Sequence, residues 1–160
     1  MDAPYLPEAD FIVMVANGDV PLSGSAMAAA NLKLLLAYTT DAEGSNRDWA
    51  TMVLAGHAPD TAEVRAALLV ATEDADAGVR GEALQGLAER DKEFARALVQ
   101  RELMRGDCAY ATFQAARLVA DRSLIEGLRA WTGRGGATWI DDEIREAITA
   151  CEKPSPAVDR

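Results

Sequence analysis

The chain has little of the chemistry from which most catalytic and metal sites are built. His57 is its only histidine, and Cys108 and Cys151 are its only cysteines. Metal sites gather several histidine, cysteine or carboxylate ligands at short spacings, and no such spacing occurs here. The glycine-flanked serine of many hydrolases and the phosphate-binding Gly-Lys-Ser/Thr loop are also missing. We therefore expect no metal, no cofactor and no enzyme activity, and we expect both thiols to be free.

Long apolar segments and alternating segments are absent as well. Apolar runs such as Leu34–Ala37 are far shorter than the ~18 residues that a membrane-spanning helix needs. No stretch alternates β-branched and polar residues as a half-buried strand does. The first residues, Met1–Glu8, are acidic and contain prolines, unlike the basic and then apolar start of a signal peptide. These absences predict a cytoplasmic, helical protein that does not bind membranes.

Basic residues are scarce relative to acidic ones. The 160 residues include 16 Lys and Arg against 26 Asp and Glu, a net charge of −10, and Lys33 is the only basic side chain before Arg47. Such a balance repels phosphate backbones, so we expect no nucleic-acid partner. Two interpretations of the acidity stay open. It keeps an alanine-rich protein in solution, or it steers a basic partner to the surface.

What the sequence does contain is a repeated helical pattern. In its clearest copy, an arginine, an alanine and a leucine occur at Arg80, Ala83 and Leu87. The same residue types lie 33 positions earlier, and a weaker copy lies 32 positions later. These flanking copies are Arg47, Ala50 and Leu54 upstream, and Thr112, Ala115 and Val119 downstream. A constant period of this kind is typical of stacked helical hairpins, in which a small alanine lets two helices approach closely.

Each copy is followed by a second amphipathic segment. Leu68, Leu98 and Leu128 lie in these segments, 30 residues apart, with apolar neighbours at helical spacing. Aspartates precede several of the expected helices, as N-cap residues do. We expect such caps at Asp76, Asp91 and Asp107, and a capping box formed by Asp60 and Glu63.

One segment resembles the first-helix signature of HEAT repeats: Asp74-x-Asp76-x-x-Val79-Arg80-x-x-Ala83-x-x-x-Leu87. Its short period is similar to that of the compact bacterial repeats of phycobilin-lyase-like proteins, and the resemblance covers roughly residues 45–131. It implies a ladder of Asp–Arg contacts between repeats. This ladder is incomplete here, because Thr112 replaces the arginine of the third copy and the first copy lacks the Asp pair. The resemblance also implies that second helices line the concave side. Tetratricopeptide and ankyrin signatures do not occur.

We therefore predict an all-α fold, a right-handed α-α superhelix or HEAT-like solenoid of about four helical hairpins plus a closing C-terminal helix. A single domain is expected to span residues 1–152. Its parts are an N-terminal capping hairpin at 1–44, repeats at 45–74, 75–106 and 107–132, and a C-terminal helix at 137–152. Residues 153–160 are expected to form a disordered tail.

Arginines concentrate on the second helices, which the resemblance places along the concave side. Two interpretations stay open: a solvated face whose charges pair at i, i+3 and i, i+4 spacing, or a groove for an anion or an acidic peptide. Trp49 aligns with Glu82 and Gln114 in the other copies, and we place it on the convex side. Trp49 and Trp131 either meet a partner or pack in the core. The candidate partner-binding residues are Arg65, Arg96, Arg101, Arg129, Trp131 and Trp49.

Stacks of helical hairpins present extended binding surfaces. We therefore predict a non-catalytic protein-protein interaction module, an adaptor or scaffold that binds a protein on its concave or acidic surface. The alternative is an immunity protein or antagonist that neutralises a basic toxin. A HEAT-like lyase or DNA-repair enzyme comes third, since residues for such chemistry are missing. The chain itself is expected to be a monomer or a weak homodimer.

Overall fold

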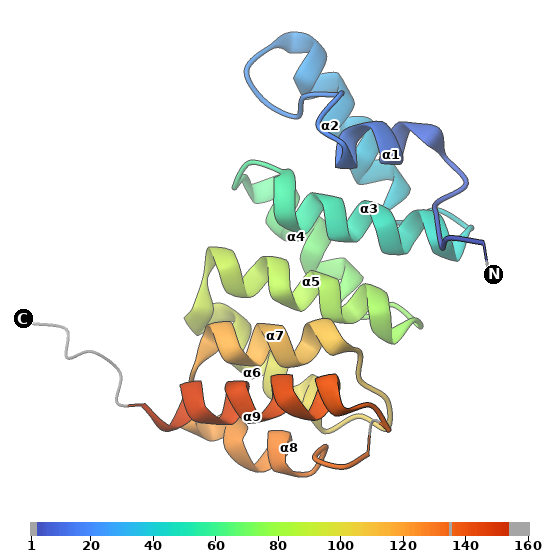
Figure 1. Cartoon of the computed structure of the whole chain (residues 1–160). Helices are drawn as coiled ribbons and strands as arrows, with labels where there is room; N and C mark the ends of the chain where they lie inside the picture. The colour runs from blue at the N-terminus through green and yellow to red at the C-terminus, as the bar shows by residue number, and fades with distance from the viewer. Residues whose placement is uncertain (1–2, 135, 154–160) are drawn as a thin grey trace, which may run out of the picture.

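The computed structural model describes residues 3–134 and 136–153, and within these ranges it contains helices and loops but no strand (Figure 1). The helices are α1 (Asp10–Ala16), α2 (Ala26–Tyr38), α3 (Gly44–His57), α4 (Ala62–Ala71), α5 (Ala77–Arg90), α6 (Lys92–Leu103), α7 (Tyr110–Val119), α8 (Ile125–Arg129) and α9 (Thr138–Glu152). A 3-10 turn at Arg122–Leu124 leads directly into α8. The predicted all-α class is confirmed for the described residues. Of the tail expected at 153–160, only Lys153 lies within them.

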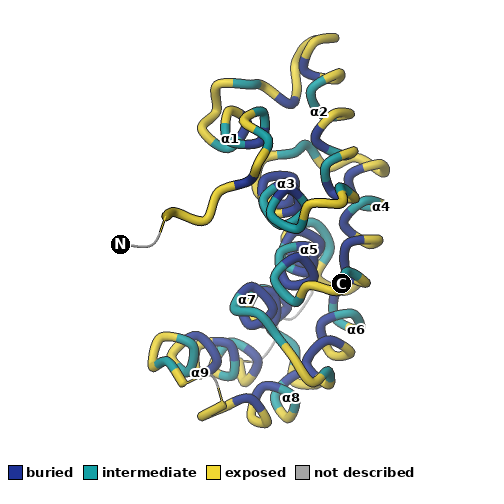
Figure 2. Tube along the Cα trace, turned by 90° about the vertical axis from the view of Figure 1, so that its right-hand side faces the viewer, coloured by how far each residue is buried: buried dark blue, intermediate teal, exposed yellow. Residues whose placement is uncertain are grey.

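The helices form two layers (Figure 2). α1, α3, α5, α7 and α9 follow one another in one layer, and α2, α4, α6 and α8 lie behind them in the second. The first layer follows an arc in which α5 is set back between α1 and α9, so that its open side is concave. The expectation that second helices line the concave side is therefore wrong, because they form the outer, convex layer.

Side-chain size explains the direction of the curvature. α3, α5 and α7 pack extensively on one another, and a Cβ atom added to Gly86 of α5 would lie 2.6 Å from the Cβ of Ala55 of α3. The second helices make few contacts with one another and carry exposed, larger apolar side chains such as Leu69, Val70 and Phe94. The layer whose helices approach most closely becomes the inner side of the arc.

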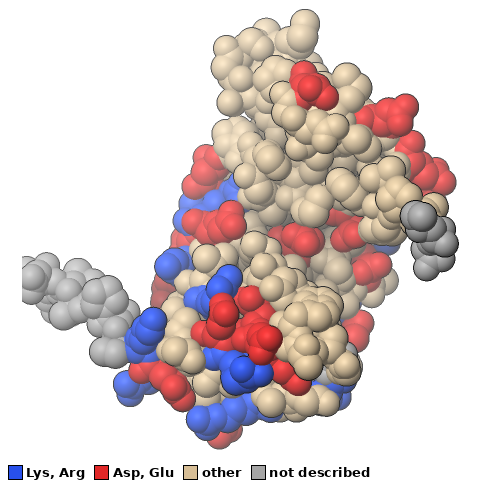
Figure 3. Space-filling model, viewed as in Figure 1, with Lys and Arg blue, Asp and Glu red and all other residues tan. Residues whose placement is uncertain are grey.

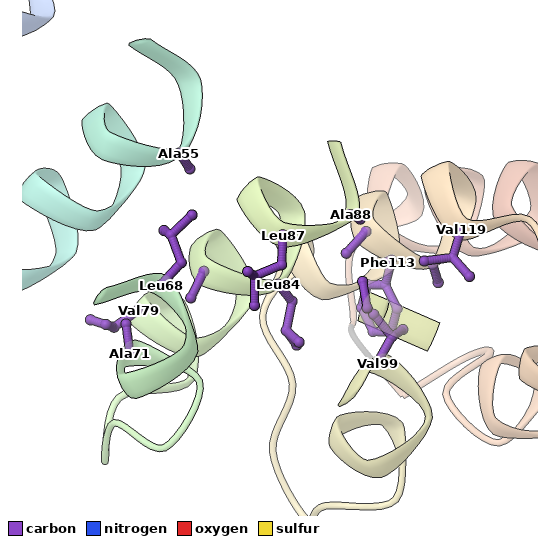
Figure 4. Packing of buried hydrophobic residues seen from close by; sticks show 14 of the residues in the cluster. Ala55, Leu68, Ala71, Val79, Leu84, Leu87, Ala88, Val99, Phe113 and Val119 are labelled. Atoms are coloured by element: carbon purple, nitrogen blue, oxygen red, sulfur yellow. The ribbon is translucent and has the colours of Figure 1, made fainter. Parts of the chain in front are cut away.

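A continuous apolar core lies between the two layers (Figure 4). The alanines that recur in the first helices are fully buried, as their regular spacing predicts: Ala50, Ala83 and Ala115. In the second helices, Leu68 and Leu128 are fully buried, and Leu98 packs partly buried against the same core. Burying one leucine side chain contributes about 1.5–3 kcal/mol. The repeated apolar positions of both helices are thus the main source of cohesion in the stack.

Two ion pairs repeat between successive hairpins. Nε of Arg47 lies 2.9 Å from an Asp74 carboxylate oxygen, and Nη2 of Arg80 lies 2.9 Å from an Asp107 carboxylate oxygen. Both arginines also donate to two backbone carbonyls of the preceding loop, those of Asp41 and Ala42 for Arg47 and those of Asp74 and Ala75 for Arg80. The ladder ends at the third copy, where the buried Thr112 replaces the arginine.

The loops before the first helices agree with the sequence analysis only in part. The two aspartates that cap helices as predicted are Asp76 and Asp91. The cap of α4 is Thr61 rather than a capping box, because its hydroxyl accepts the hydrogen bond from Val64 N. Asp107 does not cap α7, since Arg80 engages it. The first copy does keep an acidic pair, Asp41 and Glu43, at the positions of Asp74 and Asp76.

The two ends of the stack differ in polarity. α1 and α2 pack against α3 at one end, and α9 packs against α7 and α8 at the other. Met14, Met27 and Leu34 of the N-terminal helices are exposed. No helix in residues 3–134 and 136–153 is long and apolar enough to cross a membrane. The division of the chain into one domain with these parts stays a prediction.

Candidate functional site

A hollow of about 550 Å³ lies on the concave face. The C-terminal end of α1 and the flanks of α3, α5 and α7 bound it. On the α3 side it is lined mainly by apolar groups, namely Trp49, Met52, Val53 and Gly56, with His57 at the end of the helix. On the α5 and α7 side it is lined by Glu82, Gln85, Glu89 and Gln114. The hollow therefore combines an apolar wall with an acidic, hydrogen-bonding wall.

Three of the lining residues occupy the same position in successive repeats. They are Trp49, Glu82 and Gln114, which lie 33 and 32 residues apart. Because α3, α5 and α7 stack side by side, these positions form a row across the concave face. Sequence comparison predicted the equivalence but assigned Trp49 to the convex side. The structure places Trp49, half-buried, in the concave hollow.

The acidic residues of this region lack basic partners. Within the described part of the chain, no Lys or Arg lies within ion-pair distance of Glu82, Glu89 or the neighbouring Asp48 of α3. Acidic residues elsewhere are paired, and the buried Glu102, for example, contacts Arg80 at 2.8 Å. The hollow thus holds negative charge that the described residues do not compensate.

The surroundings of Glu82 disfavour its charged form. Burial raises the pKa of the Glu82 carboxyl to about 7, and the negative charges of Asp48 and Glu89 contribute in the same direction. Burial also raises the pKa of Asp48, although a hydrogen bond from the Tyr5 hydroxyl acts in the opposite direction. A positive group brought into the hollow from outside would relieve this repulsion.

A second charged cluster lies on the same face, over α7 and α9. Arg117 contacts Glu143 at 2.9 Å and Glu146 at 2.7 Å, and the Tyr110 hydroxyl donates to Glu143 at 3.1 Å. Figure 3 looks onto this face and shows acidic side chains over α3 and α5, and acidic and basic side chains intermixed lower down. The charges of the α7–α9 cluster compensate one another, so this cluster joins two helices and leaves no excess charge comparable to that of the hollow.

The four arginines predicted to line a concave groove lie on the second helices, away from the hollow. Each pairs with an acidic side chain: Arg65 with Asp60 at 2.7 Å, Arg96 with Glu93 at 2.7 Å, Arg101 with Glu73, and Arg129 with Glu152 at 3.7 Å. Exposed pairs of this kind contribute about 0–1 kcal/mol each. The arginine-lined concave groove is therefore a wrong prediction, because the layer that carries these residues faces outward.

Trp131 is part of the core and is not available to a partner. Its side chain is 9% exposed, and its indole Nε1 donates to the Leu103 carbonyl at 2.8 Å. Its ring packs against Phe113, and the Arg134 guanidinium lies 4.4 Å from the ring centroid. The sequence left exposure and core packing open for this residue, and the structure decides for the core.

The remaining reactive side chains form no evident catalytic arrangement. The described residues contain no group of histidines, cysteines and carboxylates that could hold a metal ion. Cys108 and Cys151 are free thiols, and burial raises their pKa values to about 12 and about 11. A thiol with a raised pKa carries little thiolate near neutral pH and is a poor nucleophile. The expectation that the chain is not an enzyme stays a prediction.

Comparison with known proteins yields one solved structure of similar fold. No protein-family model matches the chain, and no curated protein sequence is significantly similar to it. The crystal structure of YibA from Escherichia coli, determined by a structural genomics consortium, is similar with a TM-score of 0.59 and 20% sequence identity. The match covers 89% of this chain and 55% of the YibA chain, so this chain spans about half the length of that protein. At this identity the likeness concerns the fold alone.

Proposed function

We propose that this chain is a non-catalytic protein-binding module whose concave face receives a basic segment of a partner protein. The observation that carries the proposal is the hollow across α1, α3, α5 and α7, which joins the half-buried Trp49 to the uncompensated carboxylates of Glu82 and Glu89. A partly buried tryptophan beside a cavity is a typical interaction hot spot. Carboxylates without partners supply charge complementarity for a basic ligand.

The proposal includes the finer architecture. We regard the chain as a right-handed, HEAT-like helical solenoid. The support is the period of 33 residues, which recurs in the sequence anchors and in the Arg47–Asp74 and Arg80–Asp107 ion pairs. Solenoids of this type use their concave surface for extended protein contacts. We place the protein in the cytoplasm, in keeping with the acidic N-terminal residues.

The net charge supports a basic partner in a second way. A net charge of −10 accelerates the encounter with a cationic protein and loses this effect as salt increases. The exposed ion pairs of the outer layer do not show the same excess, since Arg65, Arg96 and Arg101 are each matched by a carboxylate. We therefore locate the interaction on the concave side and not on the arginine-rich outer side.

The same acidic hollow also fits the alternative function, an antagonist that neutralises a basic toxin. The two functions differ in the consequence of binding. An antagonist inhibits an activity of its partner at equimolar amounts, whereas an adaptor leaves that activity unchanged. An activity assay of the captured partner, with and without this chain, separates them.

Charge reversal on the two faces tests the proposal. In affinity capture from native lysate, the Glu82→Lys/Glu89→Lys variant is expected to lose the partner that the unmodified chain retains. The loss in affinity is expected to be at least about thirtyfold, because an interfacial charge pair becomes a repulsion. The matched control is Glu63→Lys/Glu93→Lys, which makes the same change in net charge on exposed positions of the outer layer.

The outer arginines provide the opposing test. Arg96→Glu/Arg101→Glu is expected to leave partner binding unchanged, with circular dichroism confirming that all three variants are folded. If this variant loses the partner while Glu82→Lys/Glu89→Lys keeps it, the outer layer is the binding surface and the proposal is wrong.

A further inference from the structure

We infer that the concave hollow is an arginine site, in which a guanidinium group of the partner stacks on the indole of Trp49 and donates hydrogen bonds to the carboxylate of Glu82. The inference rests on the proposed function and specifies the chemistry of the ligand that the concave face binds. Its basis is the combination of an uncovered aromatic ring, a set of hydrogen-bond acceptors and the lack of an internal cation.

The ring of Trp49 is available for stacking. Trp131 and Trp139 each pair with another aromatic ring, Phe113 and Tyr110 respectively, whereas in the described part of the chain no ring or cation covers Trp49. The molecule contains an example of the expected geometry, since the Arg134 guanidinium lies 4.4 Å from the Trp131 ring centroid. Guanidinium groups favour such positions over tryptophan faces.

The side chains around Trp49 accept hydrogen bonds. Glu82 occupies the next position along the row that begins at Trp49, and Glu89 lies on the same helix. Gln85 and Gln114 add amide oxygens to the lining, and no lysine or arginine of the described chain lines the hollow. A guanidinium offers five N–H donors in one plane and can stack and donate at the same time. A lysine ammonium is a point charge without a planar face, so it gains less from this arrangement.

The burial of Glu82 argues against the simpler explanation that its charge only serves solubility. A carboxylate that increases solubility is fully hydrated, whereas the surroundings of Glu82 penalise its charge and raise its pKa to about 7. The charged or titratable groups that face it are Asp48 and His57 from α3 and Glu89 from α5, while α1 and α7 contribute only the uncharged Asn17 and Gln114 to the lining. A bound guanidinium would supply the missing positive charge.

This arrangement makes binding pH-dependent in one direction. Glu82 must lose its proton to hold the cation, so the affinity is expected to rise about tenfold between pH 6 and pH 8. The Glu82→Gln variant is expected to show a flat profile over the same range. Because His57 lines the same hollow, the profile is also recorded for His57→Gln, which is expected to keep the rise.

A titration of the full chain with three short blocked peptides tests the inference. The peptides are identical except that they carry two arginines, two lysines or two neutral citrullines. Affinity is read from the NMR signal of the Trp49 indole N–H, with those of Trp131 and Trp139 as internal references. The arginine peptide is expected to shift the Trp49 signal and to bind about two- to fivefold more tightly than the lysine peptide. The citrulline peptide is expected not to bind.

Variants assign the contacts. Glu82→Gln is expected to weaken the arginine peptide about tenfold or more, and Trp49→Ala about two- to fivefold, measured for the latter from backbone amide shifts. The matched controls, Glu93→Gln on α6 and Trp139→Ala on α9, are exposed in the structure and are expected to bind as the unmodified chain does.

The outcomes separate this inference from the proposed function. Equal affinity for arginine and lysine peptides, with shifts confined to the concave face, would overturn the arginine site and leave a general basic-segment surface. If neither cationic peptide perturbs the concave face, the proposed function fails together with the inference. Shifts of the Trp139 signal alone would also overturn the assignment.

Discussion

Replacement of Arg80 by methionine is expected to lower the free energy of unfolding by about 3–5 kcal/mol, the largest loss among the substitutions considered. The Arg80 side chain is 2% exposed, and its guanidinium contacts Glu102 at 2.8 Å and Asp107 at 2.9 Å. Glu102 is also buried, with 3% of its side chain exposed. Methionine fills much of the volume of arginine but leaves this carboxylate without its cation. Urea denaturation followed by circular dichroism measures the loss.

An exposed ion pair serves as the control for Arg80. Arg101, with a side chain 52% exposed, pairs with Glu73 across two helices. Arg101→Met is expected to lower stability by no more than about 1 kcal/mol, because exposed pairs are screened by water. Addition of Glu102→Leu to Arg80→Met is expected to recover part of the loss, since the unpaired carboxylate is then removed. Equal losses for Arg80→Met and Arg101→Met would contradict the role assigned to burial.

Two glycine-to-alanine substitutions are expected to change stability in opposite directions. A Cβ atom at Gly86 would lie 2.6 Å from Ala55 Cβ and 2.9 Å from Ala55 Cα, so α3 and α5 must move apart. Gly86→Ala is therefore expected to destabilise the fold by about 1–3 kcal/mol. Gly56 also lies within a helix, but no atom lies within 4 Å of an added Cβ. Gly56→Ala is expected to stabilise by about 0.5–1 kcal/mol, as alanine is the better helix former.

The glycine pair tests the explanation of the curvature. The close approach of α3 and α5 at Gly86 is the feature that makes the first helices the inner layer of the arc. Thermal unfolding of the two variants, compared with the unmodified chain, gives the sign of each effect. A stabilising Gly86→Ala substitution would show that the two helices are less tightly packed than the structure indicates.

The regular spacing of apolar residues was sufficient to predict the helices and their anchors. Ala50, Ala83 and Ala115 recur at nearly constant spacing because each must fit between two helices, and all three are fully buried. Helical phase also placed Trp49 and Glu82 in equivalent positions. This part of the prediction depends on local periodicity, which a sequence displays directly.

The side of the stack on which the candidate site lies could not be obtained from periodicity. The assignment of the arginines to a concave groove followed from the resemblance to HEAT repeats, whereas curvature depends on how closely each layer packs. The small residues of the first helices, such as Gly86, were the signal in the sequence that favoured the opposite answer. The burial of Trp131 also depends on tertiary contacts, since its indole bonds to the Leu103 carbonyl, 28 residues away.

The pairing of Arg80 with Glu102 escaped the sequence analysis for a similar reason. The repeat pattern indicated an aspartate partner, and Asp107 does lie 2.9 Å from Arg80. Glu102 lies on α6, within the same hairpin but on the other helix, and nothing in the local pattern distinguishes it from the exposed glutamates nearby. Its burial follows from the packing of α5 against α6.

The most direct test of the binding surface is photo-crosslinking from single positions of the full chain in its native cells. A photoreactive amino acid at position 85 replaces Gln85, which lines the concave hollow, and one at position 97 replaces the exposed Ala97 of the outer layer. We expect position 85 to yield a covalent adduct with one basic protein and position 97 to yield none. An adduct with the same protein from position 97 but not from position 85 would contradict the central claim that the concave face is the binding surface.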